Sequence, residues 1–214
     1  MQTNPNGNVH VWDPVVRIGH WVLVIAFFTA YFTEDEFLTQ HVWAGYVVGG
    51  YVCLRLVWGF VGTKHARFSD FLQTPGHTMA YLRDLVRRRS VRYVGHNPAG
   101  AAMVIALLLS LSGTVYTGLV LYAVEENAGP LADMIASEEG HSSATFSMFS
   151  LAHADRERDD INEEAEEFWE ELHELFSNFT LLLVGIHIAG VLFSSYVHKE
   201  NLVKAMFTGQ KRRE

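Results

Sequence analysis

The stretch HELFSNFTLLLVGIH, residues 173–187, decides the fold of this chain, because it places two histidines fourteen residues apart on one long apolar segment. In a helix, at about 100° per residue, fourteen steps return to within roughly 40° of the starting direction. A rise of about 1.5 Å per residue separates the two histidines by roughly 21 Å along the axis. One helix would therefore present two imidazoles on the same side at two depths, which is the geometry needed to hold two stacked cofactors.

Four segments of the chain are long and apolar enough to cross a membrane. Hydrophobic residues make up 49% of the 214 residues, yet the mean hydropathy is only +0.10, so apolar and polar residues must be segregated along the chain. Each apolar segment has about the 20 residues that a spanning helix needs. The segments are residues 15–33, 42–62, 99–124 and 176–197. The alternative is a soluble bundle, but residues 99–124 are apolar all round and lack a solvent face. We predict an all-α, integral membrane four-helix bundle that forms a single domain over residues 1–214.

The N-terminal residues and the cysteine content exclude several classes of protein. The first residues are polar and predict no signal peptide. Asp13 and Pro14 predict the cap and the first residue of the first helix. Cys53 is the single cysteine, which excludes an internal disulfide, a four-cysteine iron–sulfur site and covalent haem attachment through Cys-x-x-Cys-His. Any haem in this chain is therefore held non-covalently.

Charge is distributed unevenly, although the net charge is −8. Residues 63–95 carry seven basic residues against two acidic ones, whereas residues 125–171 carry fifteen acidic residues against two basic ones. Lysine and arginine beside a span mark the cytoplasmic side, and the tail after residue 198 is basic as well. We predict that both termini are cytoplasmic and that the acidic insertion, residues 125–171, lies outside. Apolar residues at three- and four-residue steps over 161–176 predict a helix that continues into the fourth span as a periplasmic extension. The basic loop contains no nucleic-acid-binding module, so it is interpreted as a topology signal.

This topology sorts four histidines into two pairs by depth. His20 begins a rising span and His187 ends a descending one, so both lie at the inner depth. His41 and His173 lie at the outer depth by the same reasoning. A histidine inside a span is costly without a partner or ligand and is a functional candidate. Ligation of iron by two imidazoles at each depth would explain all four histidines and would suit electron transfer across the membrane.

Other roles for these histidines stay open. His20 and His187 could be polar contacts between helices, and His41 and His173 could be interfacial residues. Zinc is the main rival metal, but it prefers several donors that converge on one centre, and two separated pairs fit it poorly. A non-redox membrane protein that binds metal is therefore kept as an alternative.

Two glycines and four polar residues complete the candidate site. Gly45 and Gly49 follow His41 on the same helix face, where they provide either close helix packing or clearance for a flat macrocycle. Arg17 and Arg55 lie near the inner depth and are candidates to neutralise haem propionates; for Arg17 the alternative is a side chain that reaches up to the lipid head-groups. His96 and Asn97 lie at the inner interface, where a quinone head-group or a haem propionate could accept a hydrogen bond.

Several motifs resemble those of the prokaryotic cytochrome b-561 family, which is related to the b-type subunits of nickel–iron hydrogenases. The matching residues are Arg17-x-x-His20-Trp21, His41-Val-Trp-x-Gly-Tyr, Arg55-Leu-Val-Trp-Gly-Phe-Val-Gly-Thr, Gly95-His-Asn-Pro-Ala-Gly, His173-Glu-x-x-x-Asn with His187, and His198-Lys-Glu-Asn-Leu-Val-x-Ala-Met. The resemblance covers nearly the whole chain except residues 129–160.

The resemblance implies a four-helix protein of a bacterial inner membrane with two non-covalent b haems, whose iron is bound by histidines of the first, second and fourth helices. It also implies electron exchange with the quinone pool in a respiratory chain and, in some members, oxidation of superoxide. A strongly acidic outer surface would repel superoxide and favours docking of a basic periplasmic redox protein, such as a cytochrome c. The predicted function is electron transfer between quinone or quinol and that partner. The alternatives are a membrane anchor of a hydrogenase-like enzyme and a superoxide oxidase.

Overall fold

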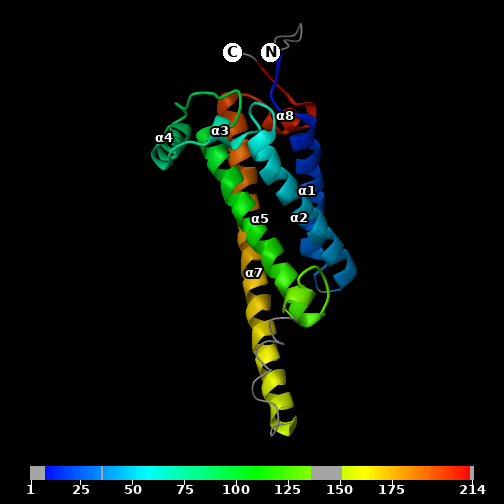
Figure 1. The fold of residues 1–214 in the computed structure, drawn as a ribbon. Coiled ribbons are helices and arrows are strands. Elements are labelled where there is room, and N and C mark those ends of the chain that lie inside the picture. Colours follow the sequence, from blue (N-terminus) through cyan, green and yellow to red (C-terminus); the bar gives the residue numbers. More distant parts are fainter. Residues whose placement is uncertain (1–7, 35, 136–150, 213–214) are drawn as a thin grey trace. The chain divides into compact units, whose positions relative to one another are not determined.

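The computed structural model describes residues 8–34, 36–135 and 151–212, and the side chains of residues 9–34, 36–135 and 163–212. Within these residues the structure consists of helices and one two-stranded ribbon (Figure 1). In chain order the elements are β1 (Asn8–His10), α1 (Pro14–Phe32), α2 (Leu38–Val61), α3 (Phe68–Phe71), α4 (Pro75–Val86), α5 (Pro98–Glu125), α7 (Leu151–His198), α8 (Leu202–Thr208) and β2 (Gln210–Arg212).

Four of these helices are long and apolar enough to cross a membrane: α1, α2, α5 and the part of α7 from Glu163 to His198. Few of their residues are buried inside the protein, and large apolar side chains such as Ile18, Phe60 and Leu182 are exposed on them. An exterior of this kind is what contact with lipid requires. The predicted all-α fold with four membrane-spanning helices is confirmed. The predicted helix that leads into the fourth span is also confirmed, because α7 runs without a break from Leu151 to His198.

The chain divides into two compact units, one of residues 1–109 with 180–214 and one of residues 110–179. In the first unit α1 and α2 pack along each other (Figure 1). Asp13 caps α1 as predicted, because its Oδ1 accepts a hydrogen bond of 3.0 Å from the Val16 amide. Its Oδ2 accepts from Trp58 Nε1 at 3.1 Å and from the Thr63 hydroxyl, which ties the start of α1 to the end of α2. Burial would raise the pKa of Asp13, but these hydrogen bonds from Thr63, Val16 and Trp58 lower it below its ordinary value.

The two ends of the described chain meet in the same unit. β1 pairs with β2 in antiparallel register, with Val9 opposite Lys211. Lys211 is buried, and its Nζ donates to the Tyr93 carbonyl at 2.9 Å and lies 3.4 Å from Glu200. Arg92 forms a second ion pair with Glu200 at 2.7 Å. This ribbon was not predicted, because strands of three residues are too short to leave an alternating pattern.

The second unit contains α5 from Ser110 onward and α7 up to Phe179. Gly113 of α5 faces Phe176 of α7 so closely that an added Cβ would lie 2.5 Å from the Phe176 ring. Tyr116 and Trp169 meet edge to face, with ring centres 6.0 Å apart. Gly113 of α5 thus allows close approach of α7.

Candidate haem site

The structure brings His20 and His187 together in the first unit. His20 lies on the second turn of α1 and His187 lies three turns before the end of α7. Their ring centres are 6.5 Å apart and the ring planes are inclined by 55°. A metal ion bound to one nitrogen of each ring, at the roughly 2.0–2.1 Å typical of metal–imidazole bonds, would need ring centres about 6 to 6.5 Å apart. The spacing of this pair therefore fits an iron ion between the two imidazoles.

Buried polar atoms around this pair also fit a cofactor with acceptor groups. Among the described residues, His20 Nδ1, Arg17 Nε and Trp21 Nε1 are buried without a hydrogen-bond partner. Leaving such groups unpaired is costly, so a ligand that accepts hydrogen bonds would be favourable here. Arg17 lies one turn before His20, and its Nη2 donates to the Phe207 carbonyl. Trp21 stacks on Phe207 with ring centres 4.3 Å apart. Trp21 was not among the predicted site residues, although its position directly after His20 was a usable signal.

Arg55 lies in α2 among groups of the following loop. It is buried, its Nη2 donates to the Ala66 carbonyl at 3.0 Å, and its guanidinium lies 5.2 Å from the centre of the Phe68 ring. Its Nη1 is buried without a partner among the described residues. One side of this guanidinium is thus satisfied by the protein, and the other is suited to an acidic or carbonyl group.

His96 lies in an aromatic cage just before α5. Its ring centre is 4.6 Å from that of Trp12 and 4.4 Å from that of Phe71, and its Nδ1 is buried without a partner among the described residues. Burial, followed by the positive charges of Arg55, Lys211 and His65, lowers the pKa of His96 to about 3. His96 is therefore a neutral imidazole at physiological pH.

Asn97 has a structural role beside His96. Its Oδ1 accepts from the Gly100 amide at 2.7 Å, and its carbonyl accepts from the Ala101 amide at 2.9 Å. Both contacts cap the start of α5. The amide oxygen of Asn97 is thus used by the helix, and a contact of Asn97 with a quinone or a propionate stays a prediction.

His41 is oriented by a hydrogen bond to the neighbouring helix. Its Nδ1 lies 2.9 Å from the Ala30 carbonyl, so Nδ1 carries the proton and donates it. A metal-binding histidine characteristically makes such a bond, which fixes its tautomer and its ring orientation. One turn further along α2, an added Cβ on Gly45 would meet no atom within 4 Å. Gly45 therefore has no packing partner for a side chain, which favours the clearance interpretation over close packing. Gly49 is half-buried on the same helix.

His173 is held in the second unit by Thr117, which the sequence did not single out. The Thr117 hydroxyl is almost fully buried and lies 3.1 Å from His173 Nδ1. It also lies 2.9 Å from the Gly113 carbonyl, which can only accept. We therefore assign the hydroxyl proton to that carbonyl and the ring proton to His173 Nδ1, which donates to Thr117. Gly118 makes room for this ring, since an added Cβ would lie 2.7 Å from His173 Cε1.

His41 and His173 thus have the same local chemistry, with the proton on Nδ1 and the lone pair on Nε2, but they belong to different compact units. Their pairing at one depth stays a prediction. Among the described residues there is also no group of three or more His, Cys, Asp or Glu side chains that could hold a metal ion by itself.

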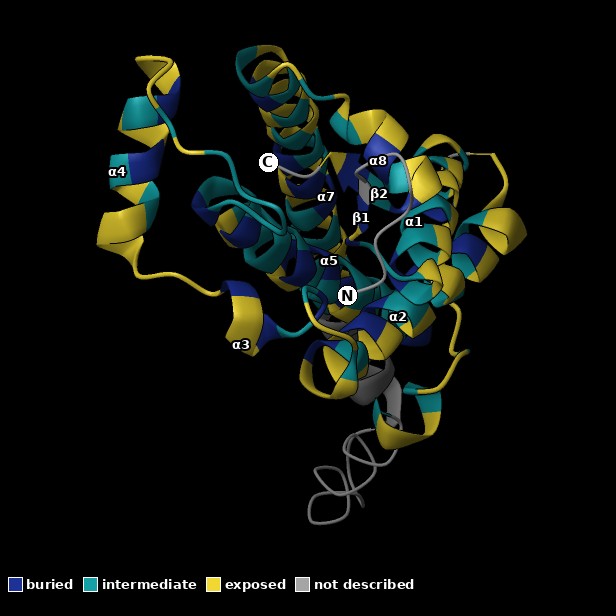
Figure 2. Cartoon of the chain, turned by 90° about the horizontal axis from the view of Figure 1, so that it is seen from above, coloured by how far each residue is buried: buried dark blue, intermediate teal, exposed yellow. Residues whose placement is uncertain are grey.

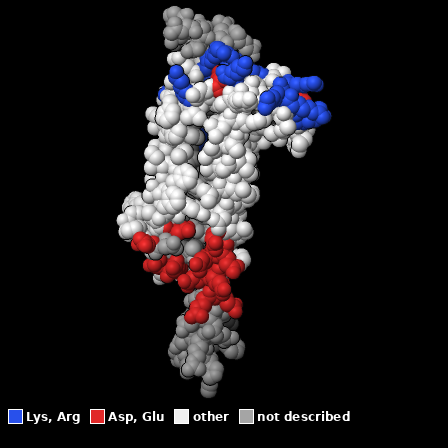
Figure 3. All heavy atoms as spheres, turned by 180° about the vertical axis from the view of Figure 1, so that it is seen from behind, with Lys and Arg blue, Asp and Glu red and all other residues white. Residues whose placement is uncertain are grey.

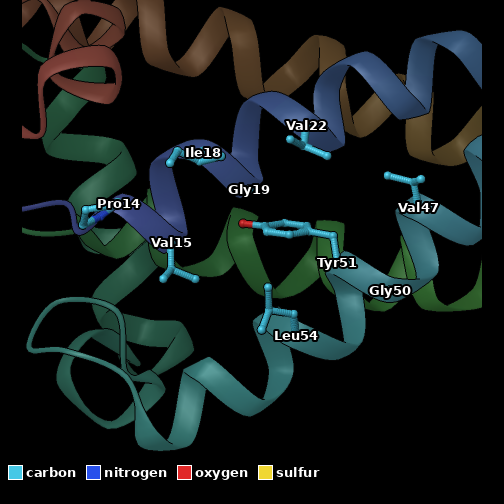
Figure 4. Close-up of a pocket in the computed structure, with 9 residues that line it drawn as sticks. All are labelled: Pro14, Val15, Ile18, Gly19, Val22, Val47, Gly50, Tyr51 and Leu54. Carbon is cyan, nitrogen blue, oxygen red and sulfur yellow. The ribbon is translucent and has the colours of Figure 1, made fainter.

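A groove of about 420 Å³ runs between α1 and α2 (Figure 4). Its lining is apolar except for Tyr51, whose ring lies across Gly19. The predicted site residues are absent from the lining, so this groove suits a hydrocarbon chain better than a haem.

Comparison with known proteins decides the family. The model of the family described as prokaryotic cytochrome b561 matches residues 11–209. The chain belongs to this family. This membership confirms the resemblance seen in the sequence. The protein is a multi-pass membrane cytochrome of the b type, and the family implies haem and electron transport.

Similar proteins of known family carry the name probable Ni/Fe-hydrogenase B-type cytochrome subunit. The one from Azotobacter chroococcum mcd 1 is 27% identical over 157 residues, which are 59% of this chain and 65% of that protein. The one from Rhizobium leguminosarum bv. viciae is 30% identical over 151 residues, 57% of this chain and 62% of that protein. The chain therefore spans less than two thirds of the length of these relatives. No solved structure matches the chain.

Proposed function

We propose that this cytochrome holds two b haems, one between His20 and His187 and one between His41 and His173, and moves electrons between the quinone pool and a periplasmic redox partner. The observation that carries the proposal is the spacing of His20 and His187, whose ring centres lie 6.5 Å apart from helices α1 and α7. A haem with two imidazole ligands supplies one-electron transfer and has no open position for a substrate.

The residues around each proposed ligand have separate tasks. Arg17 and Trp21 place buried N–H groups near His20 that can hydrogen-bond and balance carboxylate groups. The Ala30 carbonyl and the Thr117 hydroxyl fix the rings of His41 and His173. His96, neutral inside its aromatic cage, is suited to donate one hydrogen bond to a quinone carbonyl or to accept one from a quinol hydroxyl. The proposed topology places both termini in the cytoplasm of a bacterium and the spans in its inner membrane.

An acidic surface on α7 between Glu163 and Glu171 supports a basic partner. Exposed carboxylates gather there (Figure 3). They include Glu163, Glu164, Glu167, Glu170 and Glu171. A field of one sign steers an oppositely charged protein and accelerates its association, with a strong dependence on salt. We therefore propose a basic redox protein, such as a cytochrome c, as the partner at this surface.

The haem content of purified protein tests the proposal. Wild-type protein is expected to contain two haems per chain, with a b-type spectrum that can be reduced. His187→Ala is expected to remove one haem, because a single remaining imidazole binds iron far more weakly. His198→Ala is the matched control, since this histidine ends the same helix and contacts Tyr81 and Ser90 instead of another ligand candidate. Two haems in His187→Ala would refute the assignment.

A second candidate function is a membrane subunit of a hydrogenase-like enzyme. The names of the relatives, which are hydrogenase B-type cytochrome subunits, favour it. The two functions differ in what the protein associates with. Co-purification of a metalloenzyme from the native membrane would support the subunit role. A salt-sensitive rate of electron exchange with a basic cytochrome, lost when the acidic residues of α7 are replaced by glutamine, would support the stand-alone role.

A further inference from the structure

Helix α4 is a peripheral helix, and one of its faces packs against the rest of the first unit. Tyr81 and Leu85 are buried. The Tyr81 ring meets that of Tyr93 edge to face at 5.7 Å, and its hydroxyl lies 3.4 Å from His198 Nε2 at the end of α7. Both views of the fold show α4 beside the spanning helices of its unit, not among them (Figures 1 and 2).

A second apolar face of α4 has no cover among the described residues. Met79, Leu82 and Val86 are 68%, 38% and 71% exposed, although each is a large hydrophobic side chain. Their spacing of three and four residues puts them in one stripe along the helix. At about 100° per residue this stripe is turned by roughly 110° from the buried face of Tyr81 and Leu85. The stripe is therefore a surface separate from the one that attaches α4 to the protein.

Basic residues border this apolar stripe. Arg83 lies beside it on the helix, and Arg87, Arg88 and Arg89 follow directly after the last helical turn. All four are exposed. Within the described residues Arg87 and Arg89 have no carboxylate at ion-pair distance, and Arg88 only overlies the exposed ring of Tyr196 at 5.4 Å. Figure 3 shows Lys and Arg side chains gathered in this part of the first unit.

The position of α4 along the membrane normal follows from its neighbours in the first unit. The helix lies in the connection between the last residue of the α2 span, Val61, and the first residue of the α5 span, Pro98. The Thr78 hydroxyl donates to the Pro98 carbonyl at 3.5 Å. The first turn of α4 is therefore level with the first residue of a spanning helix, which is where hydrocarbon gives way to head-groups.

We propose that α4 lies in the membrane interface and binds anionic phospholipid. Met79, Leu82 and Val86 contact the acyl chains, and the arginines from Arg83 to Arg89 contact the phosphate and anionic head-groups. The apolar stripe next to a basic border is the composition of a helix that lies in an anionic membrane surface. Because α4 is level with the start of α5, the bilayer occupies the space in front of the stripe. A soluble protein could not reach the stripe there.

Fluorescence quenching in vesicles tests the placement. Full-length protein with Cys53→Ser and a single bimane-labelled Met79→Cys is reconstituted in phosphatidylcholine vesicles that contain acyl-brominated lipid. The control carries the label at His77→Cys, an exposed position about 160° around the same helix. Quenching at position 79 is expected to exceed that at position 77 at least twofold. Equal quenching at the two positions would overturn the placement.

Lipid retention tests the head-group preference. Protein is extracted from bilayers that contain equal amounts of phosphatidylcholine and phosphatidylglycerol. The lipids that remain bound are then identified and counted by native mass spectrometry. Replacement of Arg87, Arg88 and Arg89 by glutamine is expected to reduce the bound ratio of phosphatidylglycerol to phosphatidylcholine by about tenfold or more. Replacement by lysine should preserve most of it, because the charge is kept.

The matched control removes the same charge elsewhere in the unit. Lys64, Lys199 and Lys204 are exposed and lie off α4, and their combined replacement by glutamine should change the lipid ratio less than about twofold. An equal loss in this control would mean general charge attraction and would overturn a site on α4. Neither experiment depends on haem, so their outcome is independent of the proposed electron transfer.

Discussion

Replacing Gly118 by alanine tests whether the position of the His173 ring depends on α5. An added Cβ would lie 2.7 Å from His173 Cε1 and 3.1 Å from Nδ1. Carbon atoms in good contact are about 3.5–4.0 Å apart, so the ring or the helix must move by roughly 1 Å. A movement of that size would lengthen the 3.1 Å contact between Thr117 Oγ1 and His173 Nδ1 beyond hydrogen-bond range.

The cost of this change follows from the same contacts. Losing the hydrogen bond of a buried group destabilises by about 1–3 kcal/mol, and overpacking adds a similar amount. The better helix propensity of alanine returns at most about 1 kcal/mol. If His173 binds iron as proposed, loss of the bond that orients it lowers metal affinity by about 10–100-fold. Gly118→Ala protein should therefore lose most of one haem and keep the other.

Haem per polypeptide and spectroelectrochemical titration measure this outcome. Gly113→Ala is the control, because its Cβ would lie 2.5 Å from the Phe176 ring and so overpacks the same helix pair at a position whose nearest contacts are all to Phe176. The control should retain both haems. The reasoning is refuted if Gly118→Ala keeps two haems at unchanged potentials, or if Gly113→Ala loses haem to the same degree.

Two further predictions test the space beside His41 and the charge state of His96. Among the described residues, no atom lies within 4 Å of a Cβ added at Gly45, so the fold of Gly45→Ala should gain up to about 1 kcal/mol while haem content falls. Gly50→Ala, on the same helix but about 180° from His41 and equally open, should keep its haem, and full haem in Gly45→Ala would contradict the clearance interpretation. Burial and nearby positive charges hold the pKa of His96 at about 3, against an ordinary value of 6.5. Below pH 6.5 the unfolded chain therefore binds a proton that the folded chain does not, and the free energy of unfolding falls by about 2 kcal/mol at pH 5. Thermal unfolding at pH 7 and pH 5 should show a loss about 2 kcal/mol larger in wild-type protein than in His96→Gln, because the lowered pKa values of His65 and His198 contribute in both proteins. Equal pH dependence of the two proteins would contradict the prediction.

The sequence predicted those parts of the site that depend on the direction of the chain. His20 and His187 could be paired because one span rises and the other descends, and direction alone sets the depth of each residue. The cap at Asp13 was predictable because it depends only on residues next to it. Contacts that depend on the rotation of a helix were not predictable in the same way.

Thr117 shows why the rest of the site could not be predicted. Its role depends on which face of α5 meets α7, and a segment that is apolar all round carries no pattern that distinguishes its faces. The buried ion pairs of Glu200 were missed for a related reason. Arg92 lies 108 positions before Glu200, and Lys211 belongs to β2, a strand too short to leave a sequence pattern.

The surroundings of the proposed ligands differ in a way that gives electron transfer a direction. His41 and His173 each donate a ring proton to an oxygen, which raises ligand basicity and favours oxidised iron. The carboxylates on α7 before His173 act in the same sense, because negative charge also stabilises the more positive oxidation state. At the other pair, His20 Nδ1 is buried without a partner among the described residues, and the positive charge of Arg17 lies one turn away. If haems are bound as proposed, both differences place the lower reduction potential at the haem between His41 and His173. Under the proposed topology, electrons would then pass from the periplasmic side toward His20 and His187, which favours the periplasmic protein as donor and the quinone as acceptor.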